Sequence, residues 1–354
     1  MSLIDDLMKD YERKQREMGI KVKVGLIGQP GAGKSSLINK LIGEKIFDVG
    51  VSTDLTKIRQ EKELDKIIVV DFPGYGTKMF SSVDDWVDNF KVDDIDLFLF
   101  VFCGKLLDYD SKFFDYLKKW QVERQHPHFI VRNKVDDIWD DDKSLDELKE
   151  EISKDVQGKM HSYQSKVYFT SCRPPASGID ELKEAIYAAD IEGVKKSKLI
   201  YEFKATSKAD LDRKKKICLD DLNYYGITGA ANALNPIPGV DISVDLGIMV
   251  KMFADIRATF NLSDDMEDKL KKFKILLPVA NRVFPYATKA GVKLLVEKIG
   301  KQFISKEAAK YLPLVGQVFA AAAGYKMIIS VGEMYINDCY SLSEAILDGF
   351  IDSK

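Results

Sequence analysis

The sequence has little histidine and cysteine, and its cysteines are not paired at a short spacing. Three histidines and four cysteines occur among 354 residues, and the cysteines stand far apart, as Cys103, Cys172, Cys218 and Cys339. We therefore expect reduced thiols in a reducing compartment and no disulfide framework. His126 and His128 have no third metal ligand nearby, so a surface turn is the simpler interpretation.

The sequence also lacks an excess of either charge and a run long enough to span a bilayer. Lys plus Arg number 53 and Asp plus Glu number 56, so the formal net charge is -3, which predicts no nucleic-acid partner. The N-terminus has no apolar secretory segment, and Ser2 stands where myristoylation needs glycine. The most apolar run, from Tyr311 to Tyr325, is shorter than the roughly 20 residues of a membrane span. We expect a soluble, cytoplasmic chain, and leave open a peripheral contact with intracellular membranes.

What is present is a β-rich region followed by a helical one. Near-continuous apolar runs of this length are typical of strands buried on both faces of a parallel sheet. The predicted strands cover 20–27, 66–71, 95–102, 128–133 and 166–170. Amphipathic segments between them predict helices over 34–42, 111–120, 145–156 and 180–188. This alternation predicts an α/β doubly wound, mostly parallel sheet in residues 20–190.

Beyond residue 190 the β pattern fades and long apolar stretches with helical spacing follow. The sequence predicts an all-α domain over 191–354, beginning with a basic linker helix over 191–220. Residues 1–19 are too short to fold alone, so we expect them to form a helix that docks on this domain. The basic linker carries an excess of Lys and Arg, and a solvated helix is favoured there over a lipid-binding one.

The strongest motif lies between the first predicted strand and the first predicted helix. It reads GQPGAGKS over 28–35 and fits GxxxxGK[ST] in the strand–loop–helix context of a P-loop. Glycines let the backbone N–H groups face phosphate oxygens, Lys34 supplies a charge to the β- and γ-phosphates, and Ser35 supplies a hydroxyl to Mg²⁺. The residues expected to bind nucleotide here are Gly28, Gln29, Pro30, Gly31, Ala32, Gly33, Lys34, Ser35 and Ser36.

Two further motifs follow at strand ends. Asp71-Phe-Pro-Gly74 fits DxxG, in which Asp71 would hold Mg²⁺ and Gly74 would contact the γ-phosphate. Asn133-Lys134-Val135-Asp136 fits NKxD, and the Asp136 carboxylate can accept from the two adjacent N–H donors of guanine. Adenine lacks that donor pair.

A weaker motif follows the last predicted strand. It reads Thr170-Ser171-Cys172, and its position predicts contacts from Ser171 and Cys172 to the guanine base. Together the motifs predict GTP and GDP as ligands and Mg²⁺ as cofactor.

The stretch between the P-loop and DxxG holds a candidate switch, residues 50–56. Thr56 is the favoured Mg²⁺ ligand there and Thr53 the second choice. The glutamine that orients water in Ras-type hydrolysis is replaced by Tyr75, so another group must act or hydrolysis is slow. Asp54 is the nearest acidic candidate, which completes the predicted catalytic set of Lys34, Thr56, Asp54 and Gly74.

These motifs, with the N-terminal helix and the helical part containing Asn235-Pro-Ile-Pro-Gly239, resemble the immunity-related, interferon-inducible GTPase family or a bacterial or dynamin-like relative. The resemblance implies a P-loop G domain that dimerises across bound nucleotide, higher oligomers, assembly-stimulated hydrolysis and action on membranes. It also implies a catalytic role for the acidic residue two positions before the switch threonine, which is Asp54 here.

The sequence thus predicts a Mg²⁺-dependent GTPase that converts GTP to GDP and phosphate. Three alternatives stay open: a GTP-loaded scaffold with negligible hydrolysis, a dynamin-like membrane-remodelling protein, and an ATP-using P-loop protein. Tyr75 favours the first of these, and Asp136 argues against the last.

Overall fold

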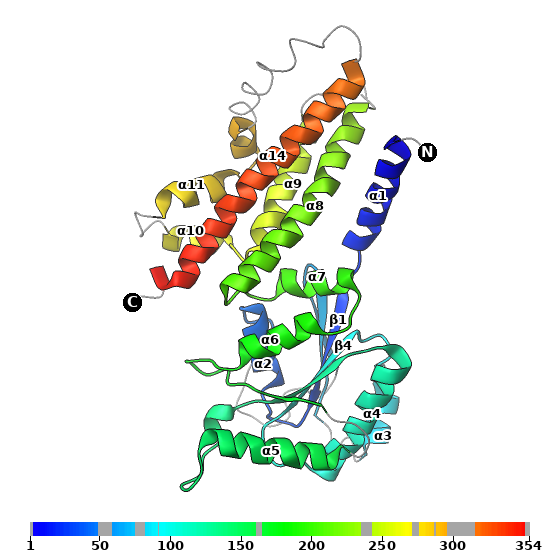
Figure 1. Cartoon of the computed structure of the whole chain (residues 1–354), viewed down its shortest axis with the longest axis vertical. Coiled ribbons are helices and arrows are strands. Elements are labelled where there is room, and N and C mark those ends of the chain that lie inside the picture. The colour runs from blue at the N-terminus through cyan, green and yellow to red at the C-terminus, as the bar shows by residue number, and fades with distance from the viewer. Residues whose placement is uncertain are drawn as a thin grey trace. The chain divides into compact units, whose positions relative to one another are not determined.

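The computed structural model describes residues 3–48, 59–74, 82–90, 92–160, 165–234, 243–270, 276–286, 288–295 and 316–350. The chain divides into two compact units (Figure 1). Ile20–Lys204 forms one unit, and Met1–Gly19 with Ala205–Lys354 forms the other.

The first unit is built on a six-stranded sheet in the order β2-β3-β1-β4-β5-β6. Its strands are β1 (Val22–Gly28), β2 (Gln60–Glu63), β3 (Ile67–Asp71), β4 (Leu97–Phe102), β5 (His128–Arg132) and β6 (Val167–Phe169). All neighbouring strands pair in parallel except β2, which is antiparallel to β3. Every residue of β4 and β5 is buried, so the predicted doubly wound, mostly parallel sheet is confirmed.

Helices cover both faces of this sheet. One face packs against α2 (Lys34–Ile42), α6 (Ile179–Ala188) and α7 (Gly193–Glu202). The other face packs against α3 (Val83–Asn89), α4 (Asp108–Arg124) and α5 (Leu145–Lys159). The carboxyl ends of β1, β3, β4, β5 and β6 therefore share one edge of the sheet, where ligands bind in open α/β folds.

The second unit is helical, as predicted. Its described helices include α1 (Leu3–Met18), α8 (Lys208–Leu234), α9 (Ser243–Thr259), α10 (Asp264–Leu270), α11 (Leu277–Tyr286) and α14 (Gly316–Ala345), which continues into a helical turn over Ile346–Phe350. Helix α1 packs on α8, where the Tyr11 and Tyr224 rings stack with centroids 5.4 Å apart. Both helices belong to this second unit.

Two glycines let the long helices α8 and α14 approach closely. A Cβ atom on Gly226 would lie 2.7 Å from the Tyr325 ring, and one on Gly332 would lie 2.3 Å from a Leu222 methyl group. Helix α14 also contacts α9, where the Phe253 and Tyr335 rings stack with centroids 4.1 Å apart. The unit therefore has its own apolar core, separate from the two faces of the sheet.

The single linker helix predicted over 191–220 is wrong, because the chain forms two helices there, α7 and α8. Leu199 and Phe203 are fully buried in the core that covers the sheet. Their burial holds α7 on the sheet unit, and the structure places the division after Lys204 instead of after residue 190.

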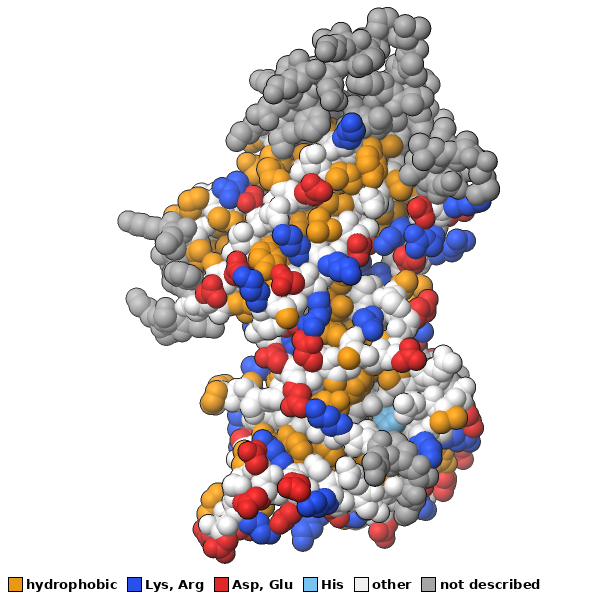
Figure 2. All heavy atoms as spheres, in the orientation of Figure 1, with side chains coloured by type: hydrophobic (Ala, Val, Ile, Leu, Met, Phe, Trp, Pro, Cys, Tyr) orange, Lys and Arg blue, Asp and Glu red, His pale blue; other side chains and the backbone are white. Residues whose placement is uncertain are grey.

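Two basic side chains of this stretch have structural partners within their own units. The Lys195 ammonium lies 2.7 Å from Asp96, and the buried Lys214 ammonium donates to the Thr259 carbonyl at 2.6 Å. On the face drawn in Figure 2, acidic and basic side chains are interspersed among the coloured atoms. None of the helices in the described ranges combines the length and apolarity that a membrane span requires.

Candidate functional site

The predicted P-loop lies between the end of β1 at Gly28 and the start of α2 at Lys34, as the sequence predicts. We call these residues, 28–34, the phosphate-type loop. Gly28, Gly31 and Gly33 all have positive φ. A Cβ on Gly28 would lie 1.9 Å from the Val101 carbonyl oxygen, and one on Gly33 would lie 2.5 Å from the Asn133 side chain. Only glycine fits both positions, because the backbone approaches neighbouring strands and loops there.

Lys34 points its ammonium back into this loop. It donates to the carbonyl oxygens of Gly28 and Gln29, each at 3.2 Å, and the residue is buried. Burial lowers the pKa of Lys34, and the nearby Asp71 carboxylate opposes that shift. A cation held by loop carbonyls at the start of a helix suits the charge of a polyphosphate.

Ser35 and Asp71 meet at the carboxyl ends of β1 and β3. The Ser35 hydroxyl donates to Asp71 Oδ2 at 2.8 Å, and the buried Asp71 Oδ1 has no hydrogen-bond partner among the described residues. Burial raises the pKa of Asp71, whereas Lys34 and the Ser35 hydroxyl lower it. A hydroxyl and an unsatisfied carboxylate oxygen fit a hard divalent cation such as Mg²⁺. In the described ranges no cluster of three or more His, Cys, Asp or Glu could hold a metal by itself.

The DxxG turn lies directly against the phosphate-type loop. A Cβ on Gly74 would be 2.7 Å from the Pro30 ring, and the Trp86 indole donates to the Pro73 carbonyl at 2.9 Å. The structure thus places the candidate γ-phosphate contact beside the loop that would hold the phosphates. Thr53, Asp54, Thr56 and Tyr75 lie outside the described residues, so their predicted roles stay predictions.

The NKxD loop is joined to the phosphate-type loop by Asn133. Its Nδ2 donates to the Ala32 carbonyl at 2.9 Å, and its Oδ1 accepts from the Thr170 hydroxyl at 3.0 Å. Lys134 follows with a left-handed φ of 58°, which turns the chain into the short helical turn that carries Asp136. One asparagine therefore links three of the segments predicted to bind nucleotide: the phosphate-type loop, the NKxD loop and the Thr-Ser-Cys motif.

Asp136 is ionised at neutral pH. A hydrogen bond from the Ser171 hydroxyl is the main influence that lowers the pKa of Asp136, and Arg173 lowers it further. The Cys172 thiol lies 3.7 Å from Asn133 Oδ1, and burial raises the pKa of that thiol to about 11. The predicted residues Ser171 and Cys172 thus border the NKxD loop, and Cys172 is protonated at neutral pH.

Two site features escaped the sequence analysis. The Gln29 side chain hydrogen-bonds to the Lys105 carbonyl in the loop after β4 and to Asp110 in the first turn of α4. Arg173 follows the Thr-Ser-Cys motif, and its Nη1 lies 3.0 Å from Asp136 Oδ2 and 2.6 Å from Asp137 Oδ1. The sequence does contain a signal for this ion pair: a basic residue stands directly after the Thr-Ser-Cys motif.

We expect Arg173→Ala to change GDP affinity by less than about fivefold, because exposed ion pairs contribute little. The Arg173 side chain is 68% exposed. Calorimetry with GDP at two salt concentrations measures the change. A loss greater than about a hundredfold would contradict this and would mean that Arg173 contacts the nucleotide directly.

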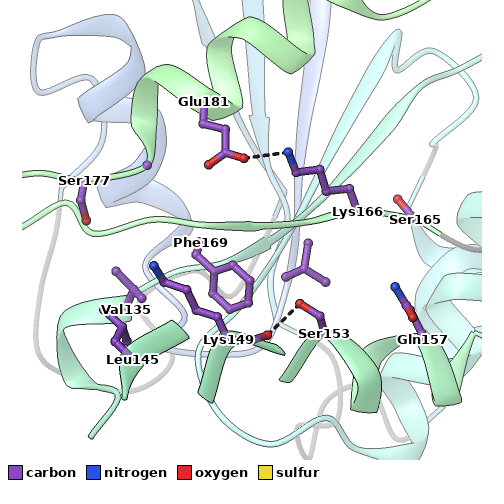
Figure 3. Close-up of a pocket in the computed structure, with 12 residues that line it drawn as sticks. Val135, Leu145, Lys149, Ser153, Gln157, Ser165, Lys166, Phe169, Ser177 and Glu181 are labelled. Carbon is purple, nitrogen blue, oxygen red and sulfur yellow. Dashed lines mark hydrogen bonds and ion pairs between the residues drawn. The ribbon is translucent and has the colours of Figure 1, made fainter. Parts of the chain in front are cut away.

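A separate pocket of about 780 Å³ lies between α5 and β6 (Figure 3). Leu145 and Lys149 of α5 form one wall, and Lys149 points from the helix into the space. Across from them Lys166 and Glu181 pair at 2.7 Å. Val135 is the NKxD residue that lines this pocket, and no residue of the phosphate-type loop does. The pocket is therefore distinct from the loop predicted to bind the phosphates.

Comparison with protein-family models finds a match to residues 23–134, described as "50S ribosome-binding GTPase". GTPase Der of Sulfurihydrogenibium sp. (strain YO3AOP1) is 30% identical over 178 residues, which are 47% of this chain and 37% of that protein. GTPase Era of Lactobacillus helveticus (strain DPC 4571) is 31% identical over 134 residues, which are 36% of this chain and 42% of that protein. This chain therefore spans less than half of either relative.

Among solved structures, a probable GTP-binding protein engB is 21% identical with a TM-score of 0.35, over 47% of this chain and 97% of that chain. Aquifex aeolicus Era bound to GDP and AlF₄⁻ is 21% identical with a TM-score of 0.38, over 57% and 68% of the two chains. The family match runs from β1 to Lys134 in the NKxD loop, and the fold of this unit is that of a P-loop G domain.

Proposed function

We propose that this chain binds GTP and hydrolyses it to GDP and phosphate with Mg²⁺ as cofactor. The observation that carries the proposal is the Asn133–Ala32 hydrogen bond of 2.9 Å. It holds a loop with an ionised, guanine-selective carboxylate against a glycine-rich loop that encloses a buried ammonium. A base with two adjacent donors and a polyphosphate tail is the ligand that such a pair of loops recognises together.

In this proposal each predicted site residue within the described ranges has one role in binding or hydrolysis. Asp136 accepts from guanine N1–H and the exocyclic amine, while Lys34 and the loop amides stabilise negative charge on the phosphates. Ser35 and Asp71 would hold Mg²⁺, which supplies electrostatic stabilisation of the phosphate oxygens when bound. The Gly74 N–H would contact the γ-phosphate. From the sequence we further assign Thr56 to the Mg²⁺ shell and Asp54 to orienting the attacking water.

The role of the helical unit is a further part of this proposal. We infer that the G domain forms a homodimer, that higher oligomers follow, and that the helical unit transmits nucleotide state to an assembly or to the surface of an intracellular membrane. The resemblance to immunity-related and dynamin-like GTPases is what supports this inference. A cytoplasmic location belongs to the same proposal.

Phosphate release measured over a range of protein concentrations tests the central proposal. We expect activity per molecule to rise with protein concentration, with light scattering rising alongside in the presence of GTP. A flat profile would count against assembly-stimulated hydrolysis. No phosphate release in a single-turnover experiment lasting hours would instead favour the GTP-loaded scaffold.

Two partner classes are separated by binding experiments. Liposome flotation with and without GTP tests a membrane-remodelling role. The family model's description names 50S ribosome binding, whereas the near balance of charge predicts no nucleic-acid partner. Co-sedimentation with 50S subunits distinguishes these two expectations.

A further inference from the structure

Gln29 is the most extensively bonded residue of the phosphate-type loop, through both its backbone and its side chain. Its N–H donates to the Val101 carbonyl at 3.2 Å. Its carbonyl accepts from the Ala32 N–H at 3.3 Å and from the Lys34 ammonium at 3.2 Å. The position of the Gln29 backbone therefore sets the position of the cation that would meet the phosphates.

The Gln29 side chain is fixed from the far side by the segment between β4 and α4. Its Oε1 accepts from the N–H groups of Cys103 and Gly104, at 3.4 and 3.3 Å. Its Nε2 donates to the Lys105 carbonyl at 3.0 Å and to Asp110 Oδ2 at 2.9 Å. Both ends of the amide are satisfied in this orientation, and the reverse orientation would set oxygen against two acceptors.

Asp110 is the part of this network that lies on a helix. It is fully buried in the first turn of α4, and the same Oδ2 also accepts from the Leu107 N–H at 2.6 Å. A carboxylate accepts without donating, so it selects the amide orientation in which Nε2 faces α4.

We infer that Asp110 is a positioning residue for nucleotide binding and acts through Gln29, an inference that rests on the proposed GTP binding. Asp110 fixes the Gln29 amide, the amide fixes the Gln29 backbone, and that backbone holds Ala32 and Lys34. The start of α4 thereby sets the shape of the loop that grips the phosphates. Asp110 itself would not touch the nucleotide.

The test is the rate at which mant-GDP dissociates from the full-length protein and four single variants. Gln29→Met keeps the side-chain volume and loses the amide. Asp110→Ala removes the carboxylate, and Asp110→Asn keeps an oxygen that accepts from both Gln29 and Leu107. Glu147→Ala is the matched control, because Glu147 accepts from the Ser144 N–H at 2.8 Å at the start of α5, away from the loop.

We expect Gln29→Met and Asp110→Ala each to speed mant-GDP dissociation by about 10- to 100-fold, as small displacements of positioning groups do. The double variant Gln29→Met/Asp110→Ala should release mant-GDP no faster than either single variant does, since both changes break the same linkage. Asp110→Asn should stay within about threefold of the wild type, and Glu147→Ala should leave dissociation unchanged while lowering thermal stability.

Three outcomes would overturn the inference. The first is wild-type dissociation in Asp110→Ala, and the second is an additive double variant, which would reduce Asp110 to a helix cap. The third is a wild-type rate of mant-GDP dissociation from Gln29→Met. This result would overturn the inference even if Asp110→Ala does not fold. Failure of the wild-type protein itself to bind mant-GDP would remove the proposed function, and this inference would fall with it.

Discussion

Replacing Asp136 with alanine should weaken GDP binding by at least about 100-fold, the largest effect on base recognition that a single substitution in this chain can have. The carboxylate would accept from two guanine donors, and without it both donors would lose their protein acceptor. Because the Ser171 hydroxyl and Arg173 lower the pKa of Asp136, the carboxylate stays ionised well below neutral pH. Its contribution to GDP affinity should therefore be constant from about pH 5 to pH 8.

Calorimetry with GDP, ADP and xanthosine diphosphate measures this effect and its cause. In Asp136→Asn the amide keeps one acceptor and gains a donor, so it should favour xanthine, whose C2 carbonyl replaces the exocyclic amine. Asp137→Asn is the matched control, because Asp137 also pairs with Arg173 but does not belong to NKxD. Unchanged GDP affinity in Asp136→Ala, or equal loss in Asp137→Asn, would contradict the assignment of the base-recognising carboxylate.

The strands that position this carboxylate were predictable because burial on both faces leaves a strong pattern. The runs at β1, β4 and β5 are nearly continuous in apolar residues, and all three strands form where the sequence predicts them. Strand β2 was missed for the opposite reason. Its sequence is QEKE, all four residues are exposed, and its pairing with β3 depends on backbone hydrogen bonds that leave no side-chain signal.

The short helix α3 was missed although it has a local start signal. Ser82 accepts from the Asp85 N–H at 3.0 Å, but only Val83 and Trp86 of its seven residues are buried, too few to show a helical period. The division between units was misplaced because α7 reads as a basic helix. Only the sheet reveals that Leu199 and Phe203 are core residues.

The candidate site shows the same limit. Spacing alone predicted site roles for Lys34, Asp71 and Asp136, since each follows a strand in a motif with a chemical reason. Spacing could not show that Gln29 faces α4 or that Arg173 pairs with Asp136. Gln29 and Asp110 lie 81 positions apart, and their contact depends on how β1 and β4 pair. Such contacts belong to tertiary structure and have no local pattern.

Replacing Lys34 with methionine should lower the rate of GTP hydrolysis by about 10²- to 10³-fold, the largest effect expected on the chemical step. Methionine keeps an unbranched side chain in the loop and removes the charge. Burial lowers the pKa of Lys34, whereas Asp71, and phosphate when bound, favour its charged form. The ammonium is therefore held where negative charge would develop on a γ-phosphate. Because it is buried, solvent screens their interaction little.

Single-turnover hydrolysis and equilibrium binding together show which step Lys34 serves. We expect GTP affinity to fall more than GDP affinity in Lys34→Met, because the ammonium reaches the β- and γ-phosphates in the assigned role. Lys45→Ala is the control: Lys45 is 67% exposed and pairs with Asp48 at 2.8 Å beyond the end of α2. If Lys34→Met hydrolysed GTP at the wild-type rate, the loop would not be the catalytic phosphate site. If it bound GTP and GDP with equal losses, Lys34 would act on the shared phosphates alone, and charge stabilisation at the γ-phosphate would have to come from another group.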